Sequence, residues 1–272
     1  MLSEIFKLFW KTVERKDARR INSQTPPTEI EQFCDIQYID DGLWQHRLDV
    51  YSKSGKLSHR PVIIDIHGGG WMYGTKEINK NYCLVLAQND YVVVNINYRL
   101  APDFSVADQL RDCFFAFKWV STNIEKYGGD LNNVFVTGDS AGGFLAAYSA
   151  LLNSSEKLRK IFGVTESGLE FRACGLTSPV CFMNTHTFQD VYYSRVKGKE
   201  FSESTLRGFE NFDVVLNKGS MPPTFLVTSS GDDVGRLPQL RCIIYCAERA
   251  LSVSLKTAIN ITEKICLTSF RL

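Results

Sequence analysis

The sequence predicts an α/β fold with a mainly parallel central sheet flanked by helices. Three observations predict it: short β-branched apolar runs recur along the chain, stretches with helical spacing separate them, and glycine-rich turns follow two of the runs. The predicted strands are residues 62–66, 91–96, 134–137, 173–177, 225–229 and 253–256, and the clearest helices are residues 108–126, 144–152 and 236–251. Parallel strands need crossover connections, so this alternation favours a parallel sheet.

A helix and a hairpin precede the alternation, and an insert interrupts it. Residues 1–30 are expected to supply an N-terminal cap helix, and residues 35–39 and 47–52 read as two strands joined by the turn Asp40-Asp41-Gly42. Residues 181–220 are too long for a simple connection, which predicts a small helical cap insert over the sheet. All 272 residues are expected to form a single domain.

The composition indicates which classes of partner the protein can be expected to bind. The net charge is +1 and no long run of Lys or Arg occurs, which argues against nucleic acid and favours a small-molecule partner. The eight cysteines form neither a CxxC pair nor a zinc-ligand spacing, so we expect no metal and mostly reduced core cysteines in a cytoplasmic protein.

The first twenty residues mix apolar side chains with charged ones. Glu4, Lys7 and Lys11 interrupt any signal-peptide core, so we expect no stable membrane insertion. The same mixture suits an amphipathic helix on a membrane surface. Packing of this helix against its own domain is the simpler interpretation.

Ser140 is the candidate nucleophile. It lies in Gly138-Asp139-Ser140-Ala141-Gly142, a G-x-S-x-G pattern that follows a predicted strand and opens a predicted helix. A serine hydroxyl needs to be raised from the backbone, with a base and amide donors near it, and this turn meets the first need. The pattern alone is weak, because glycine is common enough for it to arise by chance.

A glycine loop upstream strengthens this interpretation. His67-Gly68-Gly69-Gly70-Trp71 follows the strand at 62–66, where glycines can turn N–H groups toward a developing negative charge. A phosphate-binding loop is the alternative, but the G-x-x-x-x-G-K-[ST] spacing is missing. The expected donors are the N–H groups of Gly68 and Gly69, completed by that of Ala141.

These residues resemble the hormone-sensitive-lipase-like branch of the α/β-hydrolases, a family of carboxylesterases and lipases. The resemblance rests on the glycine loop, on Asn97-Tyr98-Arg99-Leu100-Ala101-Pro102 and on Gly138 to Gly143, in family order. It implies the α/β-hydrolase fold and hydrolysis of carboxylic esters, mostly with short acyl chains, by Ser, Asp and His without a cofactor. It makes Ser140 the nucleophile, and Gly68, Gly69 and Ala141 the oxyanion hole.

The acid of the family corresponds to Asp232, in the loop after the strand at 225–229. Asp233 remains an alternative because only register separates the two. A solvated turn with two carboxylates is the alternative interpretation of this pair.

The family's base is a histidine after the acid, and no histidine follows Asp232. We interpret His46 and His59 as surface residues, His67 as a structural support of the glycine loop, and His186 as a cap residue more often found on a surface than acting as a base. Residues 260–272 lack the family's His-bearing loop and final helix, so the C-terminus looks shortened or altered. The incomplete triad predicts weak catalysis.

Three functions therefore stay open. The first is a serine hydrolase of carboxylic esters, crippled by the missing base. The second is a non-catalytic small-molecule-binding homologue, since the same branch includes hormone receptors that resemble esterases. The third is an amide hydrolase similar to arylformamidases. The sequence does not define the physiological substrate or the oligomeric state.

Overall fold

Nine strands form one sheet in the computed structural model, which describes residues 2–55, 59–181, 183, 189–203, 206–229, 253–259 and 266–270. The strand order is β1-β2-β4-β3-β5-β6-β7-β8-β9. The strands are β1 (Ile30–Gln37), β2 (Arg47–Lys53), β3 (Arg60–Ile66), β4 (Val92–Ile96), β5 (Gly129–Asp139), β6 (Phe171–Thr177), β7 (Thr224–Ser229), β8 (Val253–Ile259) and β9 (Cys266–Phe270). Strands β4, β3, β5, β6, β7 and β8 run parallel, while β1, β2 and β9 pair antiparallel.

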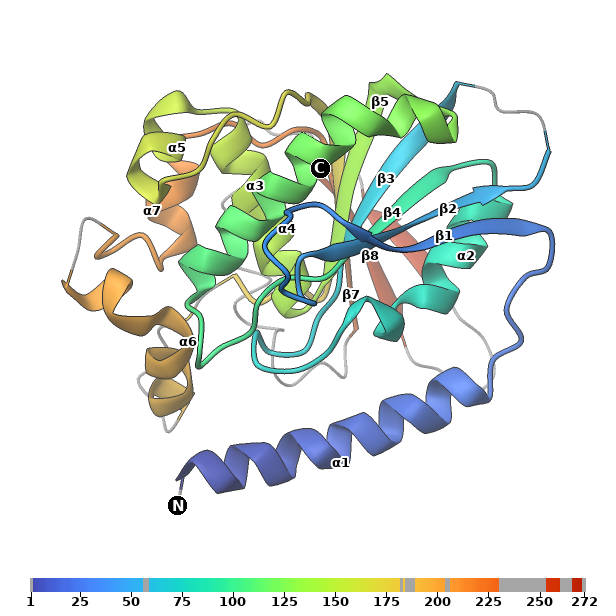
Figure 1. The fold of residues 1–272 in the computed structure, drawn as a ribbon. Helices are drawn as coiled ribbons and strands as arrows, with labels where there is room; N and C mark the ends of the chain where they lie inside the picture. The colour runs from blue at the N-terminus through green and yellow to red at the C-terminus, as the bar shows by residue number, and fades with distance from the viewer. Residues whose placement is uncertain are drawn as a thin grey trace.

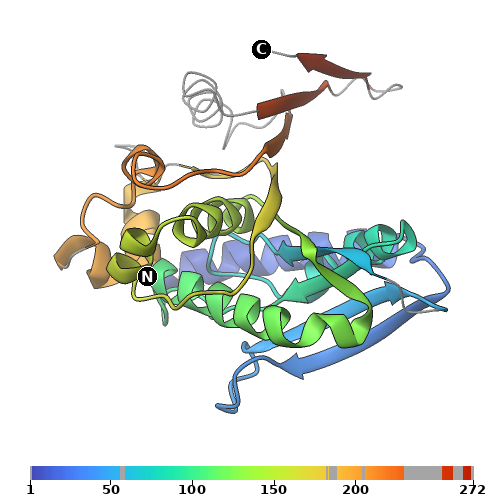
Figure 2. The ribbon, with the colours of Figure 1, turned by 90° about the horizontal axis from the view of Figure 1, so that it is seen from above.

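Helices cover both faces of the sheet (Figures 1 and 2). The α-helices are α1 (Leu2–Asn22), α2 (Lys80–Gln88), α3 (Val106–Asn123), α4 (Ala141–Asn153), α5 (Glu156–Phe162), α6 (Gln189–Glu203) and α7 (Phe212–Leu216), with 3₁₀ turns η1 (Lys76–Ile78) and η2 (Ile124–Tyr127). Helices α3 and α4 lie on one face and α2 on the other, while α1 runs along one side of the molecule (Figure 1). No described helix has the length and apolarity to cross a bilayer.

The core follows the two-residue period of the strands. In β4, Val92 and Val94 belong to the large core under α3 and α4, whereas Val93 packs with Cys83 and Leu84 of α2 on the opposite face. Both faces of this central strand are thus buried, which explains why its sequence is a continuous apolar run and not an alternating one.

The fold prediction is confirmed. The opening hairpin forms with Ile36 opposite Leu48, and the predicted strands and helices up to residue 229 recur with shifts of a few residues. Ser105 caps α3 through a capping box with Asp108, and Gly128, in the left-handed region at φ 82°, ends η2. The strand predicted at 253–256 becomes β8 and pairs with β9, which the sequence analysis did not predict. The helix predicted at 236–251 lies outside the described residues.

Five of the cysteines that the structure describes form no disulfide. Cys83, Cys113, Cys174 and Cys181 are buried, as expected of core residues, whereas Cys34 on β1 is exposed.

Candidate active site

Ser140 lies on a tight turn at the carboxyl edge of the sheet, between β5 and α4. Its backbone angles are φ 50° and ψ −115°, a strained conformation for a residue with a Cβ atom. The turn is held because the Ser140 N–H donates to the Thr177 carbonyl at 2.9 Å and its carbonyl accepts from the N–H of Val180 at 3.2 Å. This confirms the predicted strand-turn-helix geometry, which leaves the partly exposed serine facing out from the strand end.

The turn needs glycine where α4 meets the sheet. A Cβ built on Gly142 would lie 2.0 Å from the carbonyl oxygen of Ile66 and 2.5 Å from that of His67. The helix that begins at Ala141 can therefore approach β3 closely, which brings its free N-terminal N–H groups beside the glycine loop.

The glycine loop is fixed in a defined conformation. Gly69 has φ 119°, and its carbonyl accepts from the N–H of Tyr73 at 3.0 Å. The Gly68 N–H donates to Asp139 Oδ1 at 3.0 Å, so it is engaged in holding the loop to the serine turn. Among the described residues, no hydrogen-bond acceptor is assigned to the N–H groups of Gly69, Gly70 or Ala141.

His67 is a buried support of this loop. Its Nδ1 lies 2.7 Å from the Gly68 carbonyl, its ring stacks on Tyr98 at 4.4 Å between centroids, and the Tyr98 hydroxyl donates to the His67 carbonyl at 2.8 Å. Burial lowers the pKa of His67 to about 4, so the imidazole is neutral near pH 7. Since a carbonyl only accepts, Nδ1 carries the proton. These contacts support the structural role expected from the sequence.

A pair of carboxylates, the buried Asp65 and the half-buried Asp139, lies next to the site. The Asn79 amide donates to Asp65 Oδ2 at 2.9 Å and to Asp139 Oδ1 at 2.8 Å, and so bridges the ends of β3 and β5. Burial raises the pKa of both carboxyls, that of Asp65 to about 7. Asp139, the residue next to Ser140, therefore ties Asn79 and Gly68 to the serine turn.

Two helices far apart in the sequence meet at Gly70. The Tyr192 hydroxyl of α6 donates to the Gly70 carbonyl, and a Cβ on Gly70 would lie 2.6 Å from the Trp10 ring of α1. Trp10 also stacks on Tyr73 at 5.3 Å between ring centroids. Both helices thus contact the loop beside Ser140.

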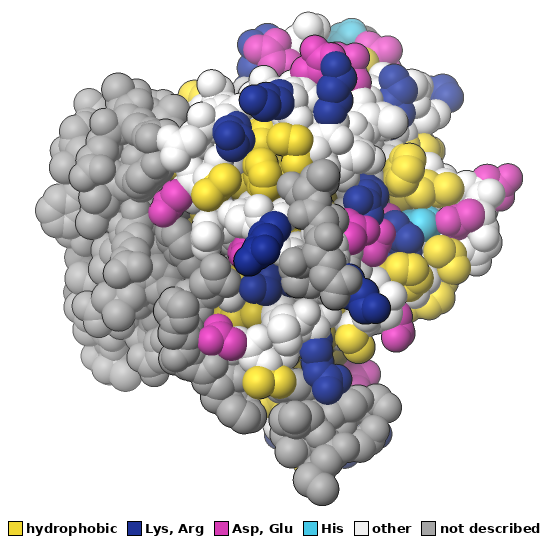
Figure 3. Space-filling view, turned by 90° about the vertical axis from the view of Figure 1, so that its left-hand side faces the viewer, with side chains coloured by type: hydrophobic (Ala, Val, Ile, Leu, Met, Phe, Trp, Pro, Cys, Tyr) yellow, Lys and Arg dark blue, Asp and Glu magenta, His cyan; other side chains and the backbone are white. Residues whose placement is uncertain are grey.

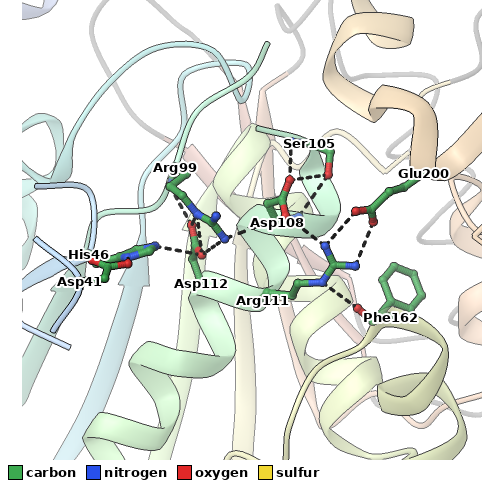
Figure 4. A network of polar contacts seen from close by, with 9 residues as sticks. All are labelled: Asp41, His46, Arg99, Ser105, Asp108, Arg111, Asp112, Phe162 and Glu200. Carbon is green, nitrogen blue, oxygen red and sulfur yellow. Dashed lines mark hydrogen bonds and ion pairs between the residues drawn. The ribbon is translucent and has the colours of Figure 1, made fainter. Parts of the chain in front are cut away.

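A polar network fixes α6 and the segment after β4 to α3 (Figure 4). Arg99 binds Asp112 through Nε at 2.9 Å and Nη2 at 2.6 Å, and Arg111 forms a two-bonded ion pair with Glu200 of α6 at 2.9 and 3.0 Å. The Asn97 to Pro102 motif therefore has a structural role here: its arginine anchors the chain to α3.

The surface interpretation of His46 is wrong. His46 is 2% exposed and lies between Asp41 at 2.7 Å and Asp112 at 3.2 Å (Figure 4). Burial opposes its protonation, but the hydrogen bonds and charges of Asp112 and Asp41 outweigh burial and raise the pKa of the imidazole. His46 can be buried because both ring nitrogens have a carboxylate partner. One partner is Asp41 in the adjacent turn, and the other is the buried Asp112, which lies 66 residues away in the chain. His59, by contrast, is exposed as predicted.

The remaining predicted site residues, Asp232, Asp233 and His186, lie outside the described residues. Strand β7 ends at Ser229 and runs parallel to β6, so its carboxyl end is at the same sheet edge as Ser140. Among described residues, no three His, Cys, Asp or Glu side chains are grouped as metal ligands.

Sequence reasoning missed Asp65, Asn79, Trp10 and Tyr192. Of these four residues, only Asp65 could have been identified from the sequence, since a carboxylate inside a buried strand requires a hydrogen-bond or ion-pair partner.

Comparisons of this chain with known proteins agree with the geometry of the serine turn and the glycine loop. The BD-FAE family model matches residues 48–188. Esterase B from Lactobacillus rhamnosis, solved with a tributyrin phosphonate inhibitor, superposes with a TM-score of 0.88 over 95% of this chain and 83% of its own, at 28% identity.

Two curated relatives are also esterases or deacetylases by name. Arylacetamide deacetylase from Oryctolagus cuniculus is 46% identical over 130 residues, which are 46% of this chain and 32% of the relative. Isoprenylcysteine alpha-carbonyl methylesterase from Arabidopsis thaliana is 28% identical over 198 residues, 69% of this chain and 46% of the relative. The chain thus spans less than half the length of these curated relatives.

Proposed function

Since the chain belongs to the BD-FAE family, in the hormone-sensitive-lipase-like branch of the α/β-hydrolases, we propose that it is a serine hydrolase of carboxylic esters with short acyl chains and that Ser140 is its nucleophile. The observation that carries the proposal is the strained turn at Ser140, placed at the start of α4 and beside a loop with unengaged N–H groups. Strain is retained at such a position when the surrounding structure and the chemistry require it.

The oxyanion donors of this proposal are Gly69 and Ala141, with Gly68 available only if its bond to Asp139 breaks. The hydrogen-bond pattern favours the N–H of Gly70 as the donor that takes the place of the Gly68 N–H, because no acceptor is assigned to it among the described residues. Donors fixed before the reaction stabilise a developing oxyanion without reorganisation, and loss of one lowers turnover by roughly 10²–10³.

Asp232 is the proposed acid, with Asp233 as its neighbour, and helices α1 and α6 are the proposed cap. The sequence holds no histidine after Asp232. Deletion of one triad member typically lowers turnover by on the order of 10⁴–10⁶. A polypeptide of these 272 residues is therefore expected to acylate slowly and to turn over poorly.

The test is labelling with a fluorophosphonate followed by peptide mapping, together with hydrolysis of p-nitrophenyl butyrate. Slow labelling confined to Ser140, and its loss in Ser140→Ala, is the expected result. Ser149→Ala, which removes a buried serine hydroxyl farther along the same helix, is the matched control and keeps the wild-type rate.

Labelling that persists in Ser140→Ala contradicts the nucleophile assignment. Ester binding without any labelling favours the non-catalytic binding protein, and preference for formyl-anilides over esters favours the amide hydrolase. Loss of activity in His186→Ala would identify a substitute base.

A further inference from the structure

Helix α1 has two different faces. Its inner face contacts the rest of the molecule: Trp10 stacks on Tyr73, the Ile21 carbonyl accepts from Asn81, and Arg20 donates to the Ile78 carbonyl at 3.2 Å. The spacing of Trp10, Val13, Asp17 and Ile21, all half-buried, is that of one side of an α-helix. The opposite side of α1 therefore faces away from the domain.

That opposite side is cationic, with an apolar start. It consists of Leu8, Phe9, Lys11, Arg15, Lys16 and Arg19, all exposed, which we call the outer row. Leu8 is 67% exposed and Phe9 56%, the highest values among the large hydrophobic residues that the structure describes as exposed. By the 100° step of an α-helix, Glu14 and Asp17 fall outside this row.

The cations of the outer row are unneutralised within the described part of the chain. None of the four has an acidic partner within 4.0 Å there, whereas Asp17 pairs with Arg20 on the inner side at 3.2 Å. Elsewhere the charges are mixed: Figure 3 shows Lys and Arg interspersed with Asp and Glu on the described part of one side of the molecule. The outer row, by contrast, carries charges of one sign, in a chain of net charge +1.

We propose that the outer row of α1 is a docking surface for an anionic lipid bilayer. Four cations on one side of a helix meet the negative charge of the headgroups, while Leu8 and Phe9 enter the boundary between headgroups and acyl chains. A solvated surface helix gains nothing from exposing two adjacent large apolar side chains, whereas a lipid interface buries them. This surface association needs no membrane-spanning segment.

Docking to a bilayer is a property separate from ester hydrolysis, but it bears on which esters come close to the site. Trp10, on the inner face of α1, contacts the glycine loop at Gly70. A bilayer bound to the outer row thus lies one helix away from the loop, which places esters dissolved in that bilayer close to the site.

The experiment is flotation of the whole protein with vesicles of phosphatidylcholine alone or with about 30 mol% phosphatidylserine. Binding to the anionic vesicles only, strong at about 0.1 M salt and largely lost at about 1 M, is expected because the screening length falls from about 10 to about 3 Å. Since binding is measured without turnover, a catalytically inactive protein tests the proposal equally well.

Two variants of the outer row and one control complete the test. Arg15→Glu with Arg19→Glu is expected to lower the partition coefficient by at least about 30-fold, and Leu8→Ser with Phe9→Ser by roughly tenfold or more. Lys118→Glu with Lys157→Glu makes the same change of charge at exposed positions of α3 and α5, which lie away from α1 (Figure 1), and leaves binding unchanged.

Absence of binding to anionic vesicles, or equal binding by all three variants, overturns the proposal. So does a stable dimer in sedimentation that only the Leu8 and Phe9 variant dissociates, because it assigns the outer row to a second copy of the chain.

Discussion

Replacement of Asp65 by Asn is expected to change how stability depends on pH. Asp65 is fully buried and its pKa lies near 7 in the folded protein, against an ordinary value of 3.8, because burial disfavours the carboxylate. Above pH 3.8 the unfolded chain has lost this proton while the folded protein still holds it. The stability that the proton provides is thus full at low pH and lost as the pH rises through about 7.

The magnitude follows from the two pKa values. Between pH 5 and pH 8, Asp65 alone is expected to remove roughly 2–3 kcal/mol of the free energy of unfolding. His46, with its raised pKa, adds a loss in the same direction, whereas His67, with its lowered pKa, adds a gain between about pH 4 and 6.5. The difference between the wild type and Asp65→Asn at each pH isolates the carboxylate from both histidines.

The assay is urea unfolding of both proteins at several values of pH from 5 to 8. The stability of Asp65→Asn relative to the wild type should rise with pH by the amount given above. A relative stability that stays constant over this range would refute the argument, because Asp65 would then titrate alike in the folded and unfolded protein.

Two further predictions test the contacts around the glycine loop. Gly142→Ala should destabilise the protein by about 3 kcal/mol or more in urea unfolding, since its Cβ would meet the Ile66 carbonyl of β3 at 2.0 Å. Gly42→Ala, at φ 78° in open space, should cost only about 1–2 kcal/mol, and equal losses would contradict the packing argument. Tyr192→Phe should slow fluorophosphonate labelling of Ser140 roughly fivefold to tenfold, because the Gly70 carbonyl loses its donor. Tyr193→Phe, which removes a neighbouring hydroxyl of α6, should not slow it, and identical rates in both variants would show that Tyr192 does not position the loop.

The parts of the fold that the sequence predicted are those with a local cause. The apolar run of β4, the helical spacing of the apolar residues in 108–126 and the glycines on both sides of Ser140 each have a local cause, so that strand, helix and turn could be located. The parallel direction of the strands followed from the crossover connections, whereas their order in the sheet is known only from the structure.

The parts that escaped prediction depend on partners far away in the chain. His46 can be buried because Asp112 forms a hydrogen bond with its ring. The Gly68 N–H is hydrogen-bonded because Asp139, 71 residues later in the chain, lies at the end of the neighbouring strand. Likewise, nothing local to Tyr192 indicates that its hydroxyl reaches Gly70, 122 residues away. Such contacts exist only once the sheet has brought the strand ends together.

The support of the glycine loop bears on what the absence of a base would do to the chemistry. Three separate contacts hold the loop: Asp139 at Gly68, His67 stacked on Tyr98 at its start, and Tyr192 at Gly70. None of them involves the acid or a base. A site without a base would therefore keep the loop in place, and the oxyanion hole together with substrate binding would keep a contribution of roughly 10³–10⁴ over the reaction in water. Measurable labelling at Ser140 without efficient turnover is the behaviour that separates a site lacking its base from a site that has collapsed.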